Sequence, residues 1–586
     1  MLKGSICYIK QTPYMRWKIK EDGNKEQIAQ LKKELVIPEI IGKLLVERGI
    51  TTFDAAKDFF RPSIESLHDP FLMEDMQKAV ERVNEALDKG QRILIYGDYD
   101  VDGTTSVALM YSFLNRFTDN IEFYQPDRYT EGYGVSLKSI EYAHEKKTDL
   151  IIALDCGIKA VNKIEKANEY GIDFIICDHH RPGKVTPNAL AILNPKKETC
   201  SYPYDELCGC GIGLKLAQAI AITRDEDEET WKELLDLVAI AIAADIVPIT
   251  GENRILAYHG LKRVNENPRI GITTILELAS KKIDLTITDL VFKLAPRINA
   301  AGRIASATKA VELLLSKDEV SSKKWSETIN AYNDERRELD AAITEEALKM
   351  VSEDDESKKS TVVFQKEWHK GVVGIVASRL IESYYKPTIV LCENDGMATG
   401  SARSVKGFDV HDAIDQCSHL LEQFGGHKYA AGLSLKVENV EAFRKRFEEV
   451  VSSTITKEQQ TRVIGIDGTL TSEDLKSSKQ GDVFPKLYRI IEQFAPFGPG
   501  NMKPTFIIKD LYDEKGWSRI VGETHLKISA KQKGENLPLK GIAFGLGEKL
   551  TIIENEKPFQ VAFSLDKNYY NNRYTLQLMI KDIKEM

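Results

Sequence analysis

The segment RILIYGDYDVDGTTSV at residues 92–107 constrains the fold more than any other part of this 586-residue chain. An apolar, strand-like run at residues 93–96 is followed by a glycine and then by carboxylates at alternate positions, Asp98, Asp100 and Asp102. Carboxylates this close repel one another unless a cation binds between them. The spacing therefore predicts a metal site at the carboxyl end of a buried strand.

Residues 76–194 alternate between strand-like and helix-compatible patterns. Strand-like runs lie at residues 93–96, 121–124, 150–154 and 174–177, separated by helix-compatible segments at 107–116, 137–146 and 160–170. This alternation predicts βαβ units and a parallel sheet covered by helices. Because ligands bind beyond the carboxyl ends of such strands, the polar residues after each run should converge at one edge. These residues are Asp98, Asp100, Asp102, Asp155, Asp178, His179 and His180.

Three features after the predicted sheet are ambiguous by themselves. Asp245 follows an apolar segment and precedes a proline turn, where an aspartate is more often a cap than a ligand. The glycine cluster at residues 209–213 opens an apolar helix, and we favour a tight packing turn over a phosphate loop. Cys208 and Cys210 form a C-x-C pair with neither a second pair nor a close histidine, which is weak evidence for zinc.

The rest of the chain predicts further domains. Residues 1–75 have helical periodicity without recognisable chemistry, and we expect a helical lead-in that packs on the next domain. Apolar residues at three-and-four spacing predict one long amphipathic helix from about residue 325 to residue 352. A second α/β region follows, and then short strands with turns, which favour a small barrel of the OB type. The predicted domains are residues 1–75, 76–320, 321–360 (long helix and linker), 361–460 and 461–586.

Two patches and one set of aromatic residues suit a nucleic acid. The glycine-rich patches at residues 400–404 and 425–432 offer backbone N–H groups and polar side chains to a phosphate, although each could equally be a turn with surface charge. The barrel region has aromatic residues beside lysines and arginines, as a single-strand platform requires. Most of these aromatic residues should nevertheless belong to the barrel core. They are Trp517, Phe544, Tyr569, Tyr570 and Tyr574.

The composition of the chain excludes few classes of protein. The net charge of −9 argues mildly against nucleic acid, but a local basic groove can coexist with a negative total. The longest apolar run, residues 237–244, is far shorter than the roughly 20 residues of a bilayer span. The N-terminus mixes lysine and arginine and lacks an apolar signal core, so we expect a cytoplasmic protein without membrane contact.

The acidic segment permits two chemistries. Residues 100–104 match the D-x-D-G-T opening of haloacid-dehalogenase phosphatases, in which the first aspartate is a nucleophile. That interpretation requires a later lysine and paired acids, whereas the later strand ends supply Asp155 and the run Asp178-His179-His180. Carboxylates with imidazole suit Mn²⁺ better than an oxygen-preferring ion, with Mg²⁺ as the alternative. Two such ions about 3.5–4 Å apart would favour phosphoester hydrolysis by an activated water.

Several motifs also carry a resemblance to a known family. GDYDVDG (97–103), LDCGI (154–158), CDHH (177–180) and ADIVP (244–248) resemble the four motifs of the DHH phosphoesterases, and GGHKYAAG (425–432) is similar to the associated DHHA1 domain. The match is narrowed to RecJ-type single-strand-specific exonucleases by YTEGYGV (129–135), PRINAAGR (296–303), WHKGVVGIVASRL (368–380), GSARS (400–404) and FAPFGPGN (494–501). The motifs follow in order over nearly the whole chain.

The resemblance implies an α/β fold: a parallel-sheet DHH domain joined by a long helix to a smaller α/β DHHA1 domain, then an OB-type barrel. It implies a 5′-to-3′ exonuclease that hydrolyses single-stranded DNA to mononucleotides in recombination and repair. Two divalent ions, Mn²⁺ or Mg²⁺, would be ligated by Asp98, Asp100, Asp102, Asp155, His179 and Asp245, with Asp155 as the bridge. Asp178 would orient the imidazoles, and His180 would meet the scissile phosphate or act as an acid. The strand and its 5′ phosphate would be held by Arg128, Arg297, Asn299, Arg303, His369, Ser401, Arg403, Gly425, Gly426 and His427.

Some points stay open. Whether Asp98 is a direct ligand is not decided, and Cys210 departs from the residue expected in its glycine turn without being a proposed ligand. We expect a monomer that meets single-stranded DNA, a helicase and a single-strand-binding protein, and no additional C-terminal domain. One alternative is a DHH oligoribonuclease or cyclic-dinucleotide phosphodiesterase, which needs neither the barrel nor the long helix. The other is a non-catalytic DNA-binding adaptor, which would not need the intact acidic cluster.

Overall fold

A computed structural model describes residues 15–279, 284–352, 357–477, 482–514, 516–554 and 557–586. The chain forms two compact units. Unit 1 takes in the chain up to Phe53 together with Arg337–Gln493 and Lys503–Met586, and unit 2 consists of Asp54–Arg336 and Phe494–Met502. In the described part of the chain, no helix combines the length and the apolar content needed to cross a bilayer.

Unit 2 is built on a parallel sheet. Its strand order is β3 (Ile121–Tyr124), β2 (Ile93–Gly97), β4 (Leu150–Leu154), β5 (Asp173–Cys177) and β6 (Ala191–Leu193), and every neighbouring pair is parallel. Successive side chains point to opposite faces, so Ile93 and Ile95 enter one core while Leu94 and Tyr96 enter another. The four predicted strands are confirmed. The three-residue β6 was not predicted because so short an apolar run carries no periodicity.

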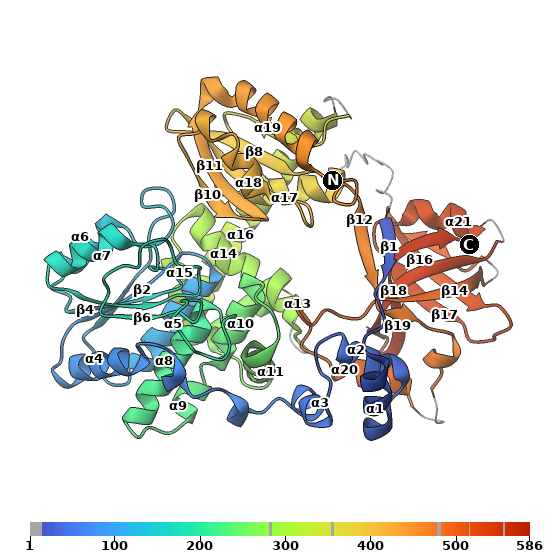
Figure 1. Ribbon diagram of the computed structural model, residues 1–586, viewed down its shortest axis with the longest axis horizontal. Helices are drawn as coiled ribbons and strands as arrows, with labels where there is room; N and C mark the ends of the chain where they lie inside the picture. The colour runs from blue at the N-terminus through green and yellow to red at the C-terminus, as the bar shows by residue number, and fades with distance from the viewer. Residues whose placement is uncertain (1–14, 280–283, 353–356, 478–481, 515, 555–556) are drawn as a thin grey trace. The chain divides into compact units, whose positions relative to one another are not determined.

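Helices cover both faces of this sheet (Figure 1). α6 (Leu137–Glu145) and α7 (Val161–Glu169) pack on the face that carries Leu94 and Tyr96. The other face is covered by α4 (Met76–Asp88), α5 (Val101–Leu114), α8 (Gly209–Thr223) and α10 (Leu235–Asp245). α10 is buried along almost its whole length, which explains its apolar sequence. The unit also contains α9 (Glu229–Lys232), α11 (Gly251–Glu266), α12 (Ile270–Leu278), α13 (Ile287–Asp289), α14 (Ala295–Ile304) and α15 (Thr308–Leu315).

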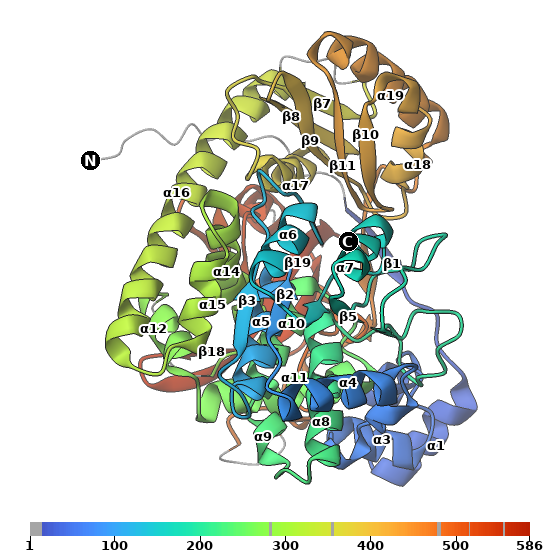
Figure 2. The same ribbon diagram turned by 90° about the vertical axis from the view of Figure 1, so that its left-hand side faces the viewer.

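A mixed sheet in unit 1 has the order β10 (Gln423–His427), β11 (Ala430–Lys436), β9 (Met397–Arg403), β8 (Thr388–Asn394) and β7 (Thr361–Phe364), and Figure 2 shows these strands side by side. α18 (Val410–Asp415) and α19 (Val440–Thr454) pack on one face and α17 (Val373–Tyr384) on the other. β10 was not predicted, because its glycines suggested a phosphate-binding patch or a turn. Pairing with β11 makes the segment a strand. α16 (Glu319–Ser352) ends where predicted, and residues 353–356 of the predicted linker lie outside the described residues.

The N-terminal segment differs from the predicted lead-in. β1 (Met15–Ile19) pairs in parallel with β12 (Arg462–Ile466), and Trp17 Nε1 donates a hydrogen bond to Asp582 Oδ2 at 2.7 Å. α1 (Lys25–Leu35), α2 (Glu39–Val46) and α3 (Phe53–Phe60) follow, and the chain up to Phe53 groups with unit 1 rather than with the next sheet. Residues 15–53 therefore group with later parts of the chain, and the segment contains a strand as well as the predicted helices. Local periodicity reveals the helices but cannot reveal a strand partner more than 400 residues away.

The C-terminal barrel is a ring of five strands, the strand number of an OB-type fold. Hydrogen-bonded pairs connect β14 (Phe506–Asp513), β18 (Phe559–Tyr570), β19 (Arg573–Glu585), β17 (Leu539–Ala543) and β16 (His525–Gln532), and β16 pairs with β14 to complete the ring. β13 (Gly468–Thr469), β15 (Arg519–Val521), α20 (Lys486–Glu492) and α21 (Leu550–Glu554) flank it. Phe506, Phe559 and Phe563 fill the core.

The expectation that most barrel aromatics belong to this core is wrong. Trp517, Phe544, Tyr569, Tyr570 and Tyr574 are between 38% and 72% exposed. The reason is their position, because they lie in connections and at strand ends, where side chains do not point into the ring.

Candidate metal centre and nucleic-acid interface

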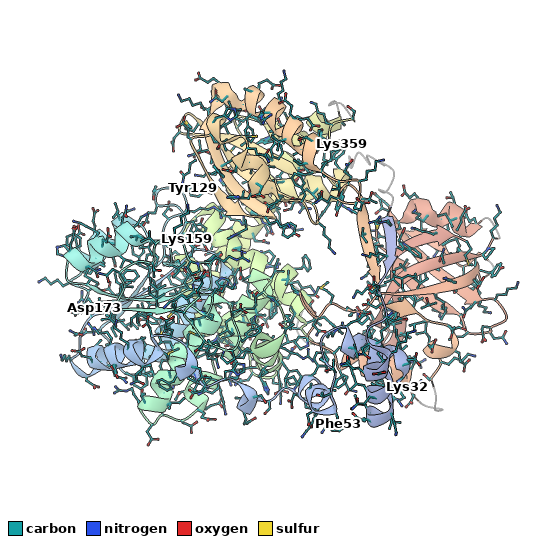
Figure 3. All side chains as sticks on the ribbon, viewed as in Figure 1. Lys32, Phe53, Tyr129, Lys159, Asp173 and Lys359 are labelled. Carbon is teal, nitrogen blue, oxygen red and sulfur yellow. The ribbon has the colours of Figure 1, made fainter. Side chains whose placement is uncertain are left out.

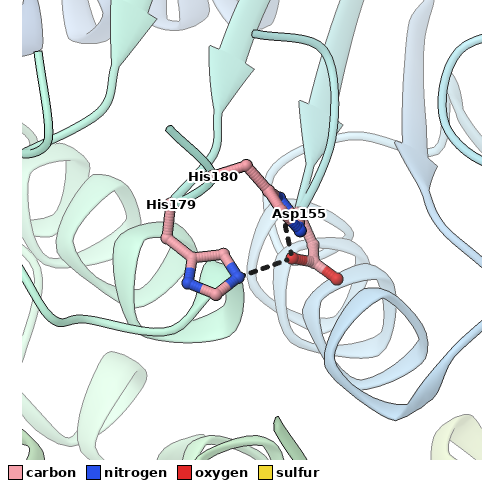
Figure 4. A group of neighbouring side chains, drawn as sticks. All are labelled: Asp155, His179 and His180. Atoms are coloured by element: carbon pink, nitrogen blue, oxygen red, sulfur yellow. Dashed lines mark ion pairs between the residues drawn. The ribbon is translucent and has the colours of Figure 1, made fainter. Parts of the chain in front are cut away.

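The carboxyl edge of the unit 2 sheet brings together acidic and imidazole side chains from four segments. His179, just after β5, places its Nε2 3.2 Å from Asp155 Oδ1, which follows β4 (Figure 4). The same Nε2 lies 3.5 Å from Asp245 Oδ2 at the end of α10 and 3.8 Å from Asp102 Oδ2 in the first turn of α5. The predicted strand ends and Asp245 therefore meet around one imidazole.

Two overlapping groups in the described chain have the geometry to hold a cation. One consists of Asp155, His179 and His180, and the other of Asp102, His179 and Asp245; within each group the ligand atoms lie within 4.8 Å of one another. Neither contains a cysteine, so no zinc cluster forms at Cys208 and Cys210 among the described residues.

Asp98 and Asp100 lie beside these groups without belonging to either. Asp98 is fully buried, and its Oδ1 accepts a weak hydrogen bond of 3.4 Å from the Gly134 N–H. Asp100 caps α5, since its Oδ1 accepts the Gly103 N–H at 3.0 Å. This cap explains why α5 begins at Val101, six residues before the predicted start. Their roles as ligands stay predictions.

The electrostatics of this cluster suit a divalent cation. Burial and neighbouring carboxylates raise the pKa of Asp98, Asp155 and Asp245 well above the ordinary value, and raise the pKa of Asp102 to about 7. Asp98 Oδ2 and Asp155 Oδ1 are buried and accept no hydrogen bond from the described residues. Buried carboxylate oxygens in that state are costly unless a cation binds them. The donor set of carboxylates and imidazole therefore fits Mn²⁺ or Mg²⁺.

The glycine cluster at the start of α8 supports this centre directly. The N–H groups of Gly209 and Cys210 donate to Asp102 Oδ2 and Oδ1 at 2.7 and 2.8 Å, where the helix N-terminus stabilises negative charge. A Cβ at Gly209 would lie 2.6 Å from Asp155 Cβ, so the favoured tight packing turn is what the structure has. The contact uses the backbone of Cys210, which explains why its unexpected side chain has no consequence there.

His180 is held by Asp178. Its Nδ1 lies 2.7 Å from Asp178 Oδ1, while Asp178 Oδ2 accepts the Ile158 N–H at 3.0 Å. Burial alone would raise the pKa of Asp178 and lower that of His180, but their hydrogen bond and opposite charges reverse both shifts. Asp178 therefore orients His180, and the Nε2 of His180 faces away from the carboxylate.

Tyr133 is a site residue that sequence reasoning missed. Its hydroxyl lies 3.1 Å from His180 Nε2, and it stands between Gly132 and Gly134, which have φ angles of +83° and +79°. These left-handed angles favour glycine, and the Tyr96 hydroxyl donates to the Gly134 carbonyl at 2.8 Å to hold the loop. The available signal was an aromatic residue between two glycines within YTEGYGV.

The predicted strand-binding residues of unit 2 lie near the acidic loop. Tyr99 lies between Asp98 and Asp100 in the sequence, and the Arg128 guanidinium lies 5.1 Å from the centre of the Tyr99 ring. α14, which carries Arg297, Asn299 and Arg303, packs close to this loop, since a Cβ at Gly302 would lie 2.7 Å from the Tyr99 carbonyl. The hydroxyl of Tyr129, labelled in Figure 3, donates to the Arg303 carbonyl. Arg297 also hydrogen-bonds Asn330 Oδ1 at 3.1 Å.

The other predicted strand-binding residues lie in unit 1, mostly on one face of its sheet. Strand register aligns Ser401 with Gly432 and Gly425, and Arg403 with Ala430 and His427. We call these six residues the glycine face. Arg403 Nη1 donates to Ser401 Oγ at 2.6 Å, and a Cβ added at Gly425 would meet open space. The face therefore combines accessible backbone with a cation, a hydroxyl and an imidazole.

Two further predicted residues, His369 and Gly426, are not part of the glycine face. His369 precedes α17 and accepts the Gly371 N–H on its Nδ1 at 3.2 Å. At the start of α17, a Cβ at Gly374 would lie 3.0 Å from Arg403 Nη2. Gly426 points the other way, because a Cβ there would lie 2.4 Å from the Ala430 carbonyl, and its φ of +148° suits glycine. Gly426 thus permits the hairpin rather than contributing to the face.

Comparisons with known proteins agree with this layout. Family models match the DHH family N-terminal domain at residues 92–242, the DHHA1 domain at 357–453 and the RecJ OB domain at 474–582. The single-stranded-DNA-specific exonuclease RecJ of Bacillus subtilis strain 168 is 36% identical over 571 residues, covering 97% of this chain and 70% of that protein. The chain belongs to the RecJ family of single-stranded-DNA-specific exonucleases.

Other RecJ proteins extend the match. RecJ of Escherichia coli is 32% identical over 579 residues, which cover 95% of this chain and 97% of that protein. The crystal structure of Thermus thermophilus RecJ in complex with Mn²⁺ shares 25% identity and has a TM-score of 0.83, with 98% of this chain and 80% of that chain covered. The predicted fold class is confirmed, whereas the predicted domain limits and residue roles stay predictions.

Proposed function

We propose that this RecJ-family chain is a metal-dependent exonuclease that hydrolyses single-stranded DNA from its 5′ end to mononucleotides, in recombination and repair. The observation that carries the proposal is the cluster of buried carboxylates around His179, two of whose oxygens accept no hydrogen bond from the described residues. The family relatives named above are single-stranded-DNA-specific exonucleases, and a Mn²⁺ complex is known for the Thermus enzyme.

The cluster would hold two divalent cations, Mn²⁺ or Mg²⁺. Asp155, His179, Asp102 and Asp245 would be the nearest ligands, Asp155 would act as the bridging ligand, and Asp98 and Asp100 would contribute negative charge beside them. Bound cations supply the positive charge that activates a water nucleophile and offsets the charge of the phosphoryl group. The backbone N–H groups at the start of α8 would fix the Asp102 carboxylate for this role and partly offset the rise in its pKa.

His180 would contact the scissile phosphate. With its Nδ1 bound to Asp178, only Nε2 is available to donate a proton or a hydrogen bond to a phosphate oxygen. The Tyr133 hydroxyl occupies that position in this structure, so Tyr133 would hold the imidazole until the substrate takes its place.

The glycine face would bind the strand and its 5′ phosphate. Ser401, Arg403 and His427 provide charged and hydroxyl donors, while Gly425 and Gly432 let the backbone approach an anion. Recognition of a terminal phosphate would give the enzyme its 5′-to-3′ polarity. Arg128, Arg297, Asn299 and Arg303 would play the same part for the backbone next to the acidic loop.

The barrel would bind the strand further along. OB folds bind single strands across their second and third strands and through the loops between strands one and two and strands four and five. Trp517 lies in the connection from β14 to β16, Phe544 follows β17, and Tyr569 and Tyr570 end β18. Trp517, Tyr569 and Tyr570 therefore lie where the loops of an OB fold would stack bases, and Phe544 lies just beyond the third strand.

A single-strand-specific enzyme needs opened duplex, so we also propose that it works as a monomer in the cytoplasm with a helicase and a single-strand-binding protein. Pull-down of both partners from cell extract, with and without nuclease treatment, tests this part.

Substrate comparison tests the function against its alternatives. The purified chain with Mn²⁺ should degrade a long single strand far faster than duplex DNA, RNA dinucleotides or cyclic dinucleotides. Preference for dinucleotides would instead support an oligoribonuclease or cyclic-dinucleotide phosphodiesterase. Binding of DNA without hydrolysis would support the adaptor.

A further inference from the structure

The motif FAPFGPGN has no part in the chemistry proposed above, yet it has a distinctive position. Phe494–Met502 belong to unit 2, while the chain on both sides of them, including α20 and β14, belongs to unit 1. We call these nine residues the strap.

Buried polar contacts fix the strap within unit 2. Arg254 of α11, which is 5% exposed, donates from Nη1 to the Phe494 carbonyl at 2.8 Å and from Nη2 to the Ala495 carbonyl at 3.0 Å. Asn501 is buried and donates from Nδ2 to the carbonyls of Phe494 and Pro496 at 2.7 and 2.9 Å. The Phe494 ring packs edge-on against Phe59 at 5.2 Å. The strap is therefore a closed loop clamped from α11.

The strap contacts the turn that follows Asp245. The Ile249 N–H donates to the Pro499 carbonyl at 2.7 Å. A Cβ at Gly498 would lie 2.5 Å from Ile249 Cδ1, and a Cβ at Gly500 would lie 2.8 Å from Thr250 Cγ2. The glycines thus allow a contact closer than any other residue would permit.

We infer that the strap positions Asp245, an inference that rests on the proposed metal-dependent function. α10 ends at Asp245 because Ile246 adopts a left-handed conformation with φ of +61°, so the direction of the carboxylate depends on where the next residues are held. The Asp245 side chain is 31% exposed, against 1–2% for Asp102 and Asp155. Of these three carboxylates, Asp245 is therefore the one that neighbouring side chains restrain least. The strap supplies the missing support four residues away, at Ile249.

The test compares Mn²⁺ binding by calorimetry with hydrolysis of single-stranded DNA in the full chain. Asn501→Ala should raise the Mn²⁺ concentration at half saturation about tenfold, the effect of losing support for a metal ligand, and lower kcat with KM for DNA unchanged. The matched control is Asn265→Ala, because Asn265 ties the Leu285 backbone to α11 through the same kind of hydrogen bonds. The control should bind Mn²⁺ like the wild type.

Unchanged Mn²⁺ affinity in Asn501→Ala, or an equal loss in Asn265→Ala, would overturn the inference alone. A wild-type chain that binds no Mn²⁺ would overturn the proposed function as well. If Asn501→Ala does not fold, Gly498→Ala provides the same readout, since its added Cβ would lie 2.5 Å from Ile249 Cδ1 and 3.0 Å from Ile249 Cγ1 and would push the strap and Ile249 apart.

Discussion

At the scale of single residues, the site depends on pairs in which one side chain fixes another. Asp178 holds Nδ1 of His180, the α8 N-terminus holds Asp102, and Tyr133 lies against His180 Nε2. None of these partners would react with the substrate itself, but each restricts the position of a side chain that would. The loss of such a partner usually costs one to two orders of magnitude in activity.

Tyr133→Phe should therefore lower kcat/KM roughly tenfold with little change in kcat, because the hydroxyl holds the His180 ring only until the substrate replaces it. Steady-state kinetics on single-stranded DNA measure this. Tyr142→Phe is the control, since Tyr142 hydrogen-bonds Glu122 away from the acidic cluster. Equal activity of Tyr133→Phe and the wild type would show that the hydroxyl has no positioning role.

The candidate ligands could be predicted from the sequence because each directly follows a strand-like run or belongs to a motif. Tyr133 and the N–H groups of Gly209 and Cys210 could not. Their contribution depends on loop geometry and on backbone atoms, which every residue has and which no residue type signals.

At the scale of elements, strands and helices with strong local periodicity were predicted closely, including β2 to β5 and the end of α16. β1, β6 and β10 were not, because each is short and becomes a strand only through its partner. β10 is an example: its glycines suggested a phosphate-binding patch or a turn, whereas pairing with β11 makes the segment a strand and brings Gly425 and His427 into the glycine face.

Arg403→Ala should weaken binding of 5′-phosphorylated single strands by about 1.5–3 kcal/mol, the usual contribution of a charged hydrogen bond. The dependence of affinity on salt should fall as one phosphate contact is lost. Fluorescence anisotropy at several salt concentrations measures both. Arg444→Ala is the matched control. Arg444 lies on α19, outside the glycine face, and donates hydrogen bonds to the Val362 carbonyl and to Glu441 Oε2. Equal losses in both variants would rule out the glycine face as the phosphate site.

In the barrel, Trp517→Ala should weaken binding of long single strands by about 1–3 kcal/mol through lost stacking, while Trp517→Phe should retain most of the affinity. Binding of oligonucleotides too short to reach the barrel should not change in either variant. The same loss for short and long strands would mean that Trp517 acts through folding instead.

At the scale of the whole molecule, the order of the sequence does not follow the order of the units. The chain up to Phe53 groups with the C-terminal parts, and the strap leaves unit 1 for unit 2. Deletion of residues 461–586 would therefore remove the partner of β1 and the support of the Asp245 turn together with the barrel. Point substitutions in the barrel test strand binding more cleanly.

Metal binding should stabilise unit 2, because the buried carboxylates repel one another without a cation. Mn²⁺ at about 100 times its dissociation constant should add about 2.7 kcal/mol to the free energy of unfolding for each cation bound. Thermal denaturation with and without a chelator measures the shift, and Asp155→Asn should reduce it. A melting temperature that does not respond to Mn²⁺ would contradict a cation at this cluster.

The most direct test of the central claim is digestion of a single strand labelled at its 5′ or 3′ end, with Mn²⁺ present, by the wild type and by Asp155→Asn. We predict that the wild type releases the 5′ label at once as a mononucleotide, shortens the 3′-labelled strand progressively, and stops when a chelator is added. Asp155→Asn should lose at least about 100-fold in rate. Release of the 3′ label first, or parental activity in Asp155→Asn, would contradict the account.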